Sequence, residues 1–172
     1  MTDTRTRIAD CVRARPGVHF NDLVRRLDLA PGQVQHHLKR LLSDERLIAD
    51  ELYGRTHYYP PEFDPWERRV LALVRRETPR DVVACLLDAG GSAPPASVAD
   101  AVGIARSTLE WHLDNLTEAD VVTKTYDERG RVTLTLTRPE RTADLVASVS
   151  PSLPGRFVDR FTRLVDDLLA EE

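Results

Sequence analysis

The chain has 172 residues, 41% hydrophobic and 30% charged, so it can form a packed core and is not disordered by composition. No apolar run approaches the roughly 20 residues of a membrane helix, and the N-terminus lacks a signal-peptide stretch, so we expect a soluble cytoplasmic protein. The net charge of −4 is unusually acidic for a nucleic-acid-binding protein, so that function would require a local excess of basic side chains.

Residues 1–61 predict three helices followed by a β-hairpin. An apolar helical pattern runs up to Pro16, and a second helix is expected to begin with Asn21 as its N-cap. Pro31 suits the first turn of a third helix, whose buried stripe comprises Val34, His37, Leu38 and Leu41. Strands at 48–53 and 56–59, with Gly54-Arg55 as the turn, predict the hairpin.

Residues 62–78 predict a linker helix, and residues 79–138 repeat the order of the first unit. The second unit has expected helices at 82–89, 96–102 and 106–119 and strands at 122–126 and 132–137. Residues 139–172 predict two further helices, the last with an apolar stripe that includes Phe157, Phe161, Leu164 and Leu168. That stripe must be buried, either on its own domain or in a homodimer.

An internal repeat connects the two units. Residues 29–41 align without gaps on residues 104–116 at an offset of 75, and Ala, His and two Leu positions are identical. The same offset aligns apolar positions over about forty residues, which two unrelated amphipathic helices would not do across the intervening turns. The sequence therefore predicts two copies of one small domain.

The order in each copy is two helices joined by a short turn, then a third helix, then a hairpin. This is the order of the winged helix-turn-helix. Residues 34–41, with the following Leu47-Ile48 and hairpin, resemble the third helix and wing of ArsR/MarR-like transcription regulators. Of the 24 basic residues 22 are arginine, and with the acidic balance the tandem units resemble regulators of halophilic archaea. The expected fold class is mostly α with small β-hairpins (α+β), and the resemblance implies sequence-specific binding of double-stranded DNA.

The outward face of the third helix in the first copy is the candidate reading surface. Gln and Arg can pair with adenine and guanine, Lys and His can contact phosphate, and a glycine near the helix start permits close approach. A merely solvated polar face is the alternative. The candidate DNA contacts in this copy are, on the third helix, Gly32, Gln33, Gln35, His36, Lys39 and Arg40 and, at the wing, Arg55 and His57. We expect Tyr53, Tyr58 and Tyr59 to pack within the strands rather than stack on bases.

The second copy differs in charge. Residues 1–60 carry ten basic and eight acidic side chains, a net charge of +2, whereas residues 79–138 carry six and nine, a net charge of −3. Trp111, Asp114 and Glu118 face outward on its third helix, so this copy is expected to contact partners through Trp111. Its candidate DNA contacts are Arg106, Lys124, Arg129 and Arg131. A protein-interaction scaffold is therefore the alternative function for the chain.

The remaining polar and sulfur-containing side chains do not indicate catalysis or a cofactor. His37 and His112 fall on the buried stripes, so we expect half-buried structural histidines with hydrogen-bond partners. Cys11 and Cys85 lie in helical apolar patterns without CxxC spacing, which indicates two reduced thiols rather than a disulfide or a metal site. No phosphate-binding loop, Ser-His-Asp set or paired carboxylates stand out, so we expect neither an enzyme nor a bound cofactor.

Overall fold

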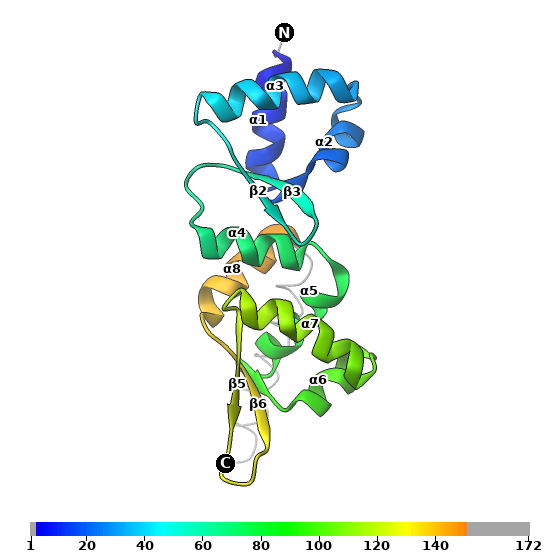
Figure 1. Cartoon of the computed structure of the whole chain (residues 1–172), viewed down its shortest axis with the longest axis vertical. Coiled ribbons are helices and arrows are strands. Elements are labelled where there is room, and N and C mark those ends of the chain that lie inside the picture. Colours follow the sequence, from blue (N-terminus) through cyan, green and yellow to red (C-terminus); the bar gives the residue numbers. More distant parts are fainter. Residues whose placement is uncertain (1–2, 151–172) are drawn as a thin grey trace, which may run out of the picture. The chain divides into compact units, whose positions relative to one another are not determined.

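The computed structural model describes residues 3–150, and the expected stripe at Phe157, Phe161, Leu164 and Leu168 lies outside these described residues. The chain divides into two compact units, Met1–Ala72 and Leu73–Glu172, each built from helices and one small antiparallel sheet (Figure 1). The mostly α fold with small β-hairpins, in two winged helix-turn-helix units, is thereby confirmed.

The first unit contains three helices and a three-stranded sheet. Its elements are α1 (Thr4–Ala14), β1 (Val18–His19), α2 (Phe20–Leu27), α3 (Pro31–Ser43), β2 (Ile48–Leu52) and β3 (Arg55–Tyr59), followed by α4 (Pro65–Val74). The sheet order is β1-β3-β2, with Val18 opposite Tyr58 and Ile48 opposite Tyr59. The helices supply the core with Ile8, Val12, Leu23, Val34, Leu38 and Leu41. The short strand β1 was not expected from the sequence, because two residues carry no periodic pattern.

The wing hairpin turns one residue earlier than expected. Tyr53 and Gly54 both have positive φ, 53° and 78°, and Leu52 pairs with Arg55 across the turn. Two central residues in this conformation form a type I′ turn, whose twist matches that of the flanking strands. Arg55 is therefore the first residue of β3 and not part of the turn itself.

The start of α2 corrects the prediction of Asn21 as its N-cap. The N-cap is His19, whose Nδ1 accepts the backbone N–H of Asp22 at 3.4 Å. Asn21 instead lies within the first turn of the helix. Histidine was overlooked because the preferred capping residues are Asn, Asp, Ser and Thr.

The second unit repeats the first. Its elements are α5 (Glu77–Asp88), β4 (Ser92–Ala93), α6 (Pro95–Val102), α7 (Arg106–Glu118), β5 (Val122–Tyr126), β6 (Val132–Leu136) and α8 (Pro139–Val149). The sheet order β4-β6-β5 matches that of the first unit, and Figure 1 shows the β5–β6 hairpin projecting from the helices. The hairpin loop includes Gly130, with φ of 73°, and is longer than the turn of the first wing.

The offset of 75 persists in the backbone conformation. Helices α6 and α7 have the bounds of α2 and α3 shifted by 75, and the left-handed caps at Asp28 and Gly103 obey the same offset. After the third helix, Glu45 and Asp120 both adopt φ near 55°, at 54° and 57°. Because helix bounds and left-handed residues agree at positions 75 residues apart, the two units are two copies of one domain.

Candidate nucleic-acid interface

Helix α3 presents a polar face to solvent. Its apolar side chains Val34, Leu38 and Leu41 are buried in the core, which fixes the rotation of the helix. The predicted reading residues on its other faces are all exposed: Gly32, Gln33, Gln35, His36, Lys39 and Arg40. Pro31 occupies the first helical turn as expected, and the space beside Gly32 is open, so a ligand can approach the backbone there.

Two of these exposed residues are cations without a compensating carboxylate. Within residues 3–150, neither Lys39 nor Arg40 forms an ion pair. Their charges are therefore directed to solvent and available to an anionic ligand. A depression of about 440 Å³ lies beside Lys39, and it is lined by Phe20, Gln35, Leu38, Lys39, Leu42, Thr56 and Tyr58.

At the wing, the structure separates the two residues that were expected to act together. Arg55 is exposed at the start of β3, as the prediction requires. His57 has only 2% of its surface exposed, and its Nδ1 lies 2.7 Å from the carbonyl oxygen of Gly17. His57 is therefore buried and does not reach the surface where DNA would lie, because β1 pairs with β3 at this position, with His19 opposite His57, and the Gly17 carbonyl contacts the His57 ring.

The tyrosines of the wing take part in packing. Tyr58 and Tyr59 are buried, and the Tyr59 hydroxyl donates to the carbonyl oxygen of Arg68 at 2.8 Å. Burial raises the pKa of Tyr58 above its usual value, so the hydroxyl stays protonated. These two side chains therefore pack within the unit, as expected, rather than standing exposed for stacking on bases.

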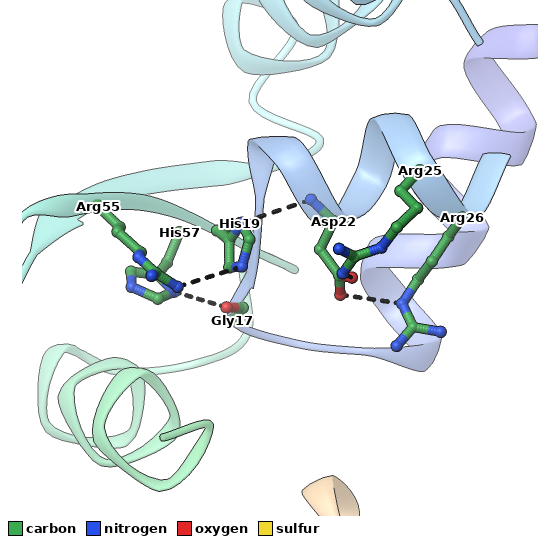
Figure 2. Close-up of polar contacts among 7 residues, drawn as sticks. All are labelled: Gly17, His19, Asp22, Arg25, Arg26, Arg55 and His57. Atoms are coloured by element: carbon green, nitrogen blue, oxygen red, sulfur yellow. Dashed lines mark hydrogen bonds and ion pairs between the residues drawn. The ribbon is translucent and has the colours of Figure 1, made fainter. Parts of the chain in front are cut away.

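A network of polar residues links the start of α2 to the wing (Figure 2). The carboxylate of Asp22 accepts from Arg25 Nη2 at 2.5 Å and from Arg26 Nε at 2.9 Å. His19 Nε2 lies 3.4 Å from Arg55 Nη1, and the rings of His19 and His57 meet edge to face at 6.4 Å. Sequence reasoning missed this network, although arginines three and four residues after Asp22 have the spacing of ion pairs within a helix.

Asp22 remains ionised at the centre of this network. Burial raises the pKa of its carboxyl, but hydrogen bonds and charge from Arg26 and Arg25 outweigh burial, so the pKa lies below its usual value. Asp22 therefore offsets one of the two guanidinium charges that it contacts, and it restricts the positions of both side chains.

In the second unit, carboxylates neutralise most of the predicted DNA contacts. Lys124 Nζ lies 2.6 Å from Glu110 Oε2, and Arg106 Nε lies 3.7 Å from Glu110 Oε1. Arg131 pairs with Asp127 at 2.6 Å, and backbone and side-chain bonds from Arg131 hold the pKa of Asp127 below its usual value. The Arg129 side chain is exposed. These cations remain candidate contacts, but three of the four already have an acidic partner.

Helix α7 carries an exposed aromatic side chain where α3 carries His36. Trp111 is 60% exposed and meets the ring of His112 edge to face at 4.8 Å. His112 is half-buried, and burial together with the positive charge of Arg76 lowers its pKa. His37 is also half-buried, but its Nδ1 has no hydrogen-bond partner within the described part of the chain, contrary to expectation.

The cysteines and histidines do not gather around a metal position. Cys11 and Cys85 are half-buried and form no disulfide within residues 3–150. Among the same residues, no group of three His, Cys, Asp or Glu side chains is arranged to hold a metal ion. None of the helices described is both long and apolar enough to span a membrane.

Comparison with known proteins finds one family match within each half of the chain. A family model described as an "N-terminal HTH domain" matches residues 2–71, and a second, described as a "Helix-turn-helix domain", matches residues 74–125. No curated protein sequence matches the chain. The two matched segments include α3 and α7, the third helices of the two repeats.

Two solved structures are distantly similar. NadR, solved in complex with 4-hydroxyphenylacetate, has a TM-score of 0.40 and 19% identity, over 81% of this chain and 88% of that chain. BpsR of Bordetella bronchiseptica, whose DNA binding is regulated by 6-hydroxynicotinic acid, has a TM-score of 0.39 and 17% identity, over 81% of this chain and 94% of that chain. At this distance the two structures carry no argument about ligands of this chain.

Proposed function

Because the chain is a tandem helix-turn-helix protein, with the domains of a DNA-binding transcription regulator, we propose that its first domain reads DNA sequence in the major groove with α3. One observation carries this proposal. Lys39 and Arg40 are exposed on α3 without an acidic partner among the described residues, whereas Glu110 on α7 neutralises its neighbouring cations. A duplex is a dense line of negative charge, so it favours the first surface over the second.

The side chains on α3 divide into two roles. Gln35 and Arg40 have the donors and acceptors to pair with adenine and guanine, so we assign base readout to them. Lys39 and His36 suit phosphates, which position the domain without selecting sequence. At Gly32 and Gln33, near the start of the helix, we expect the protein backbone to approach a DNA phosphate closely. Arg55 adds a contact from the wing.

Binding isotherms of single variants test these roles. Arg40→Ala and Gln35→Ala should each cost about 1–3 kcal/mol on a preferred site and relax base preference there. Lys39→Ala should weaken binding to all duplexes alike. It should also reduce, by about one, the steepness of the salt slope, which is the slope of log K against the log of salt concentration. Trp111→Ala is the control on the second domain. The assignment fails if Trp111→Ala abolishes binding while Arg40→Ala and Gln35→Ala leave it unchanged.

We assign protein contact, rather than base readout, to the second domain. Trp111 and Tyr126 are the large apolar side chains that stand exposed among residues 3–150, at 60% and 67%, and both belong to this domain. Exposed aromatic side chains are typical anchors of protein interfaces. If the first domain bound no DNA, these side chains would favour an interaction scaffold as the function of the whole chain.

The proposed regulator acts as a homodimer through the apolar stripe expected within residues 151–172. A dimer would place two copies of α3 about 34 Å apart, on successive major-groove faces, and would favour a pseudo-palindromic site. Light scattering of the full chain should give a dimer at micromolar concentration, and a version ending at Ser150 should be a monomer. A monomeric full chain would contradict the proposal.

A further inference from the structure

An open pocket lies between the N-terminal end of α2 and the wing. It has a volume of about 610 Å³ and is lined by His19, Phe20, Asn21, Arg25, Gly54, Arg55 and Thr56. Of these residues only Arg55 belongs to the DNA contacts expected from the sequence. Beside the ring of Phe20, the polar side chains of this lining are two guanidinium groups, an imidazole, an amide and a hydroxyl, and these groups can donate to an anionic ligand.

The charge balance around the pocket is positive. Arg25 and Arg55 contribute two guanidinium charges to the lining, and the carboxylate of Asp22 that contacts Arg25 is shared with Arg26, so the lining keeps a net positive charge. Within the described residues, Arg55 has no carboxylate partner. The partial positive charge at the start of α2 adds to the same potential.

One of the two arginines that line the pocket is held by a carboxylate, and the other lies beside a histidine ring. Asp22 Oδ1 accepts from Arg25 Nη2 at 2.5 Å, and His19 Nε2 lies 3.4 Å from Arg55 Nη1. Figure 2 shows Arg55 on one side of His19 and Asp22 and Arg25 on the other. Each guanidinium has five N–H donors, so both retain donors for a ligand after these contacts are made.

We propose that this pocket is a phosphate clamp, in which Arg25 and Arg55 hold one phosphate group between α2 and the wing. The identification of that group as a DNA backbone phosphate rests on the proposed function of the first domain. The pocket shares Phe20 and Thr56 with the depression beside Lys39, so a single backbone can pass from α3 to the clamp.

The salt dependence of binding to a random-sequence duplex tests the clamp, and Arg26 supplies a matched control. Arg25 and Arg26 contact the same carboxylate, but only Arg25 lines the pocket. Each phosphate contact contributes about 0.9 to the slope of log K against log salt. Arg25→Gln and Arg55→Gln should each reduce the slope by about one, whereas Arg26→Gln should leave it near the wild-type value.

The outcomes separate the clamp from the function on which it rests. Equal slopes for Arg25→Gln and Arg26→Gln would overturn the clamp, and a reduced slope for Lys39→Ala in the same series would leave the proposed function standing. Titration with inorganic phosphate, followed through the Nε–Hε NMR signals of the arginines, gives the second arm. A shift of the Arg25 signal in a protein that binds no duplex would support a clamp for free phosphate and reject the DNA function. If neither phosphate nor duplex affects Arg25, the clamp is wrong.

Discussion

Lys124 Nζ lies 2.6 Å from Glu110 Oε2, and Glu110 occupies in the second domain the position that Gln35 occupies in the first. Glu110 also lies 3.7 Å from Arg106 through its other oxygen. One carboxylate at this position thus neutralises two cations on the face that would approach a duplex. The difference between Gln35 and Glu110 is therefore a clear physical distinction between α3 and α7.

Exchanging Gln and Glu at these two positions should change the affinity of the chain for a duplex in opposite directions. Gln35→Glu should weaken binding of the full chain to a random duplex by about tenfold, because it places a carboxylate against the phosphates. Glu110→Gln should increase that affinity and the salt slope, because Lys124 and Arg106 lose their partner. Glu118→Gln, on the same exposed face, controls for net charge. Binding isotherms at several salt concentrations provide the measurement, and equal effects of Glu110→Gln and Glu118→Gln would contradict the prediction.

Asp22 should contribute stability that depends on pH. Its pKa is lower in the folded chain than in the unfolded chain, so its contribution is fully present above the unfolded value of about 3.9 and is lost as the pH falls through the folded value. Asp22→Asn should therefore cost about 1–2 kcal/mol at pH 7 and progressively less in acid. Urea unfolding between pH 7 and pH 3 measures this, with the exposed Asp10→Asn as the control. A constant difference between Asp22→Asn and wild type across this range would show that the ion pairs are not responsible.

His57 should matter for stability and not for DNA contact. Its Nδ1–H donates to the Gly17 carbonyl oxygen, which can only accept, and the side chain is buried. His57→Ala should lower the free energy of unfolding by about 1–3 kcal/mol, because that carbonyl loses its donor in the interior. His36→Ala, at an exposed position, should leave stability unchanged. A reduced salt slope for His57→Ala with unchanged stability would instead restore His57 as a DNA contact.

Arg68 should stabilise the first domain by connecting α4 to the wing. Its Nε lies 2.5 Å from Asp50 Oδ2 and its Nη1 donates to the carbonyl oxygen of Phe63 at 2.7 Å, with the Arg68 side chain only 14% exposed. Arg68→Ala should cost about 3 kcal/mol, because Asp50 loses its partner in a partly buried site. Arg13→Ala, which breaks an exposed pair with Asp10, should cost less than about 1 kcal/mol. Thermal unfolding of both variants measures the difference, and similar losses for the two would refute a special role for Arg68.

The sequence by itself determined the type of domain and which face of each helix is buried. Apolar spacing in residues 31–43 fixed which face of α3 is buried, because a helix repeats every 3.6 residues and its burial pattern is local. The offset of 75 predicted the second copy, and the helix start at Pro31 and the strands at 122–126 and 132–137, the second of which ends at Leu136 in the structure, followed from equally local rules.

Only the tertiary structure decided which polar side chains face a ligand and which have partners. Gly17 and His57 are 40 residues apart, His19 and Arg55 are 36 apart, and Glu110 and Lys124 are 14 apart. Their contacts depend on the packing of a hairpin against a helix, which no local periodicity encodes. The burial of His57 and the neutralisation of Lys124 by Glu110 thus followed from pairings between segments distant in sequence, where the energy of a charge depends on its neighbours in space.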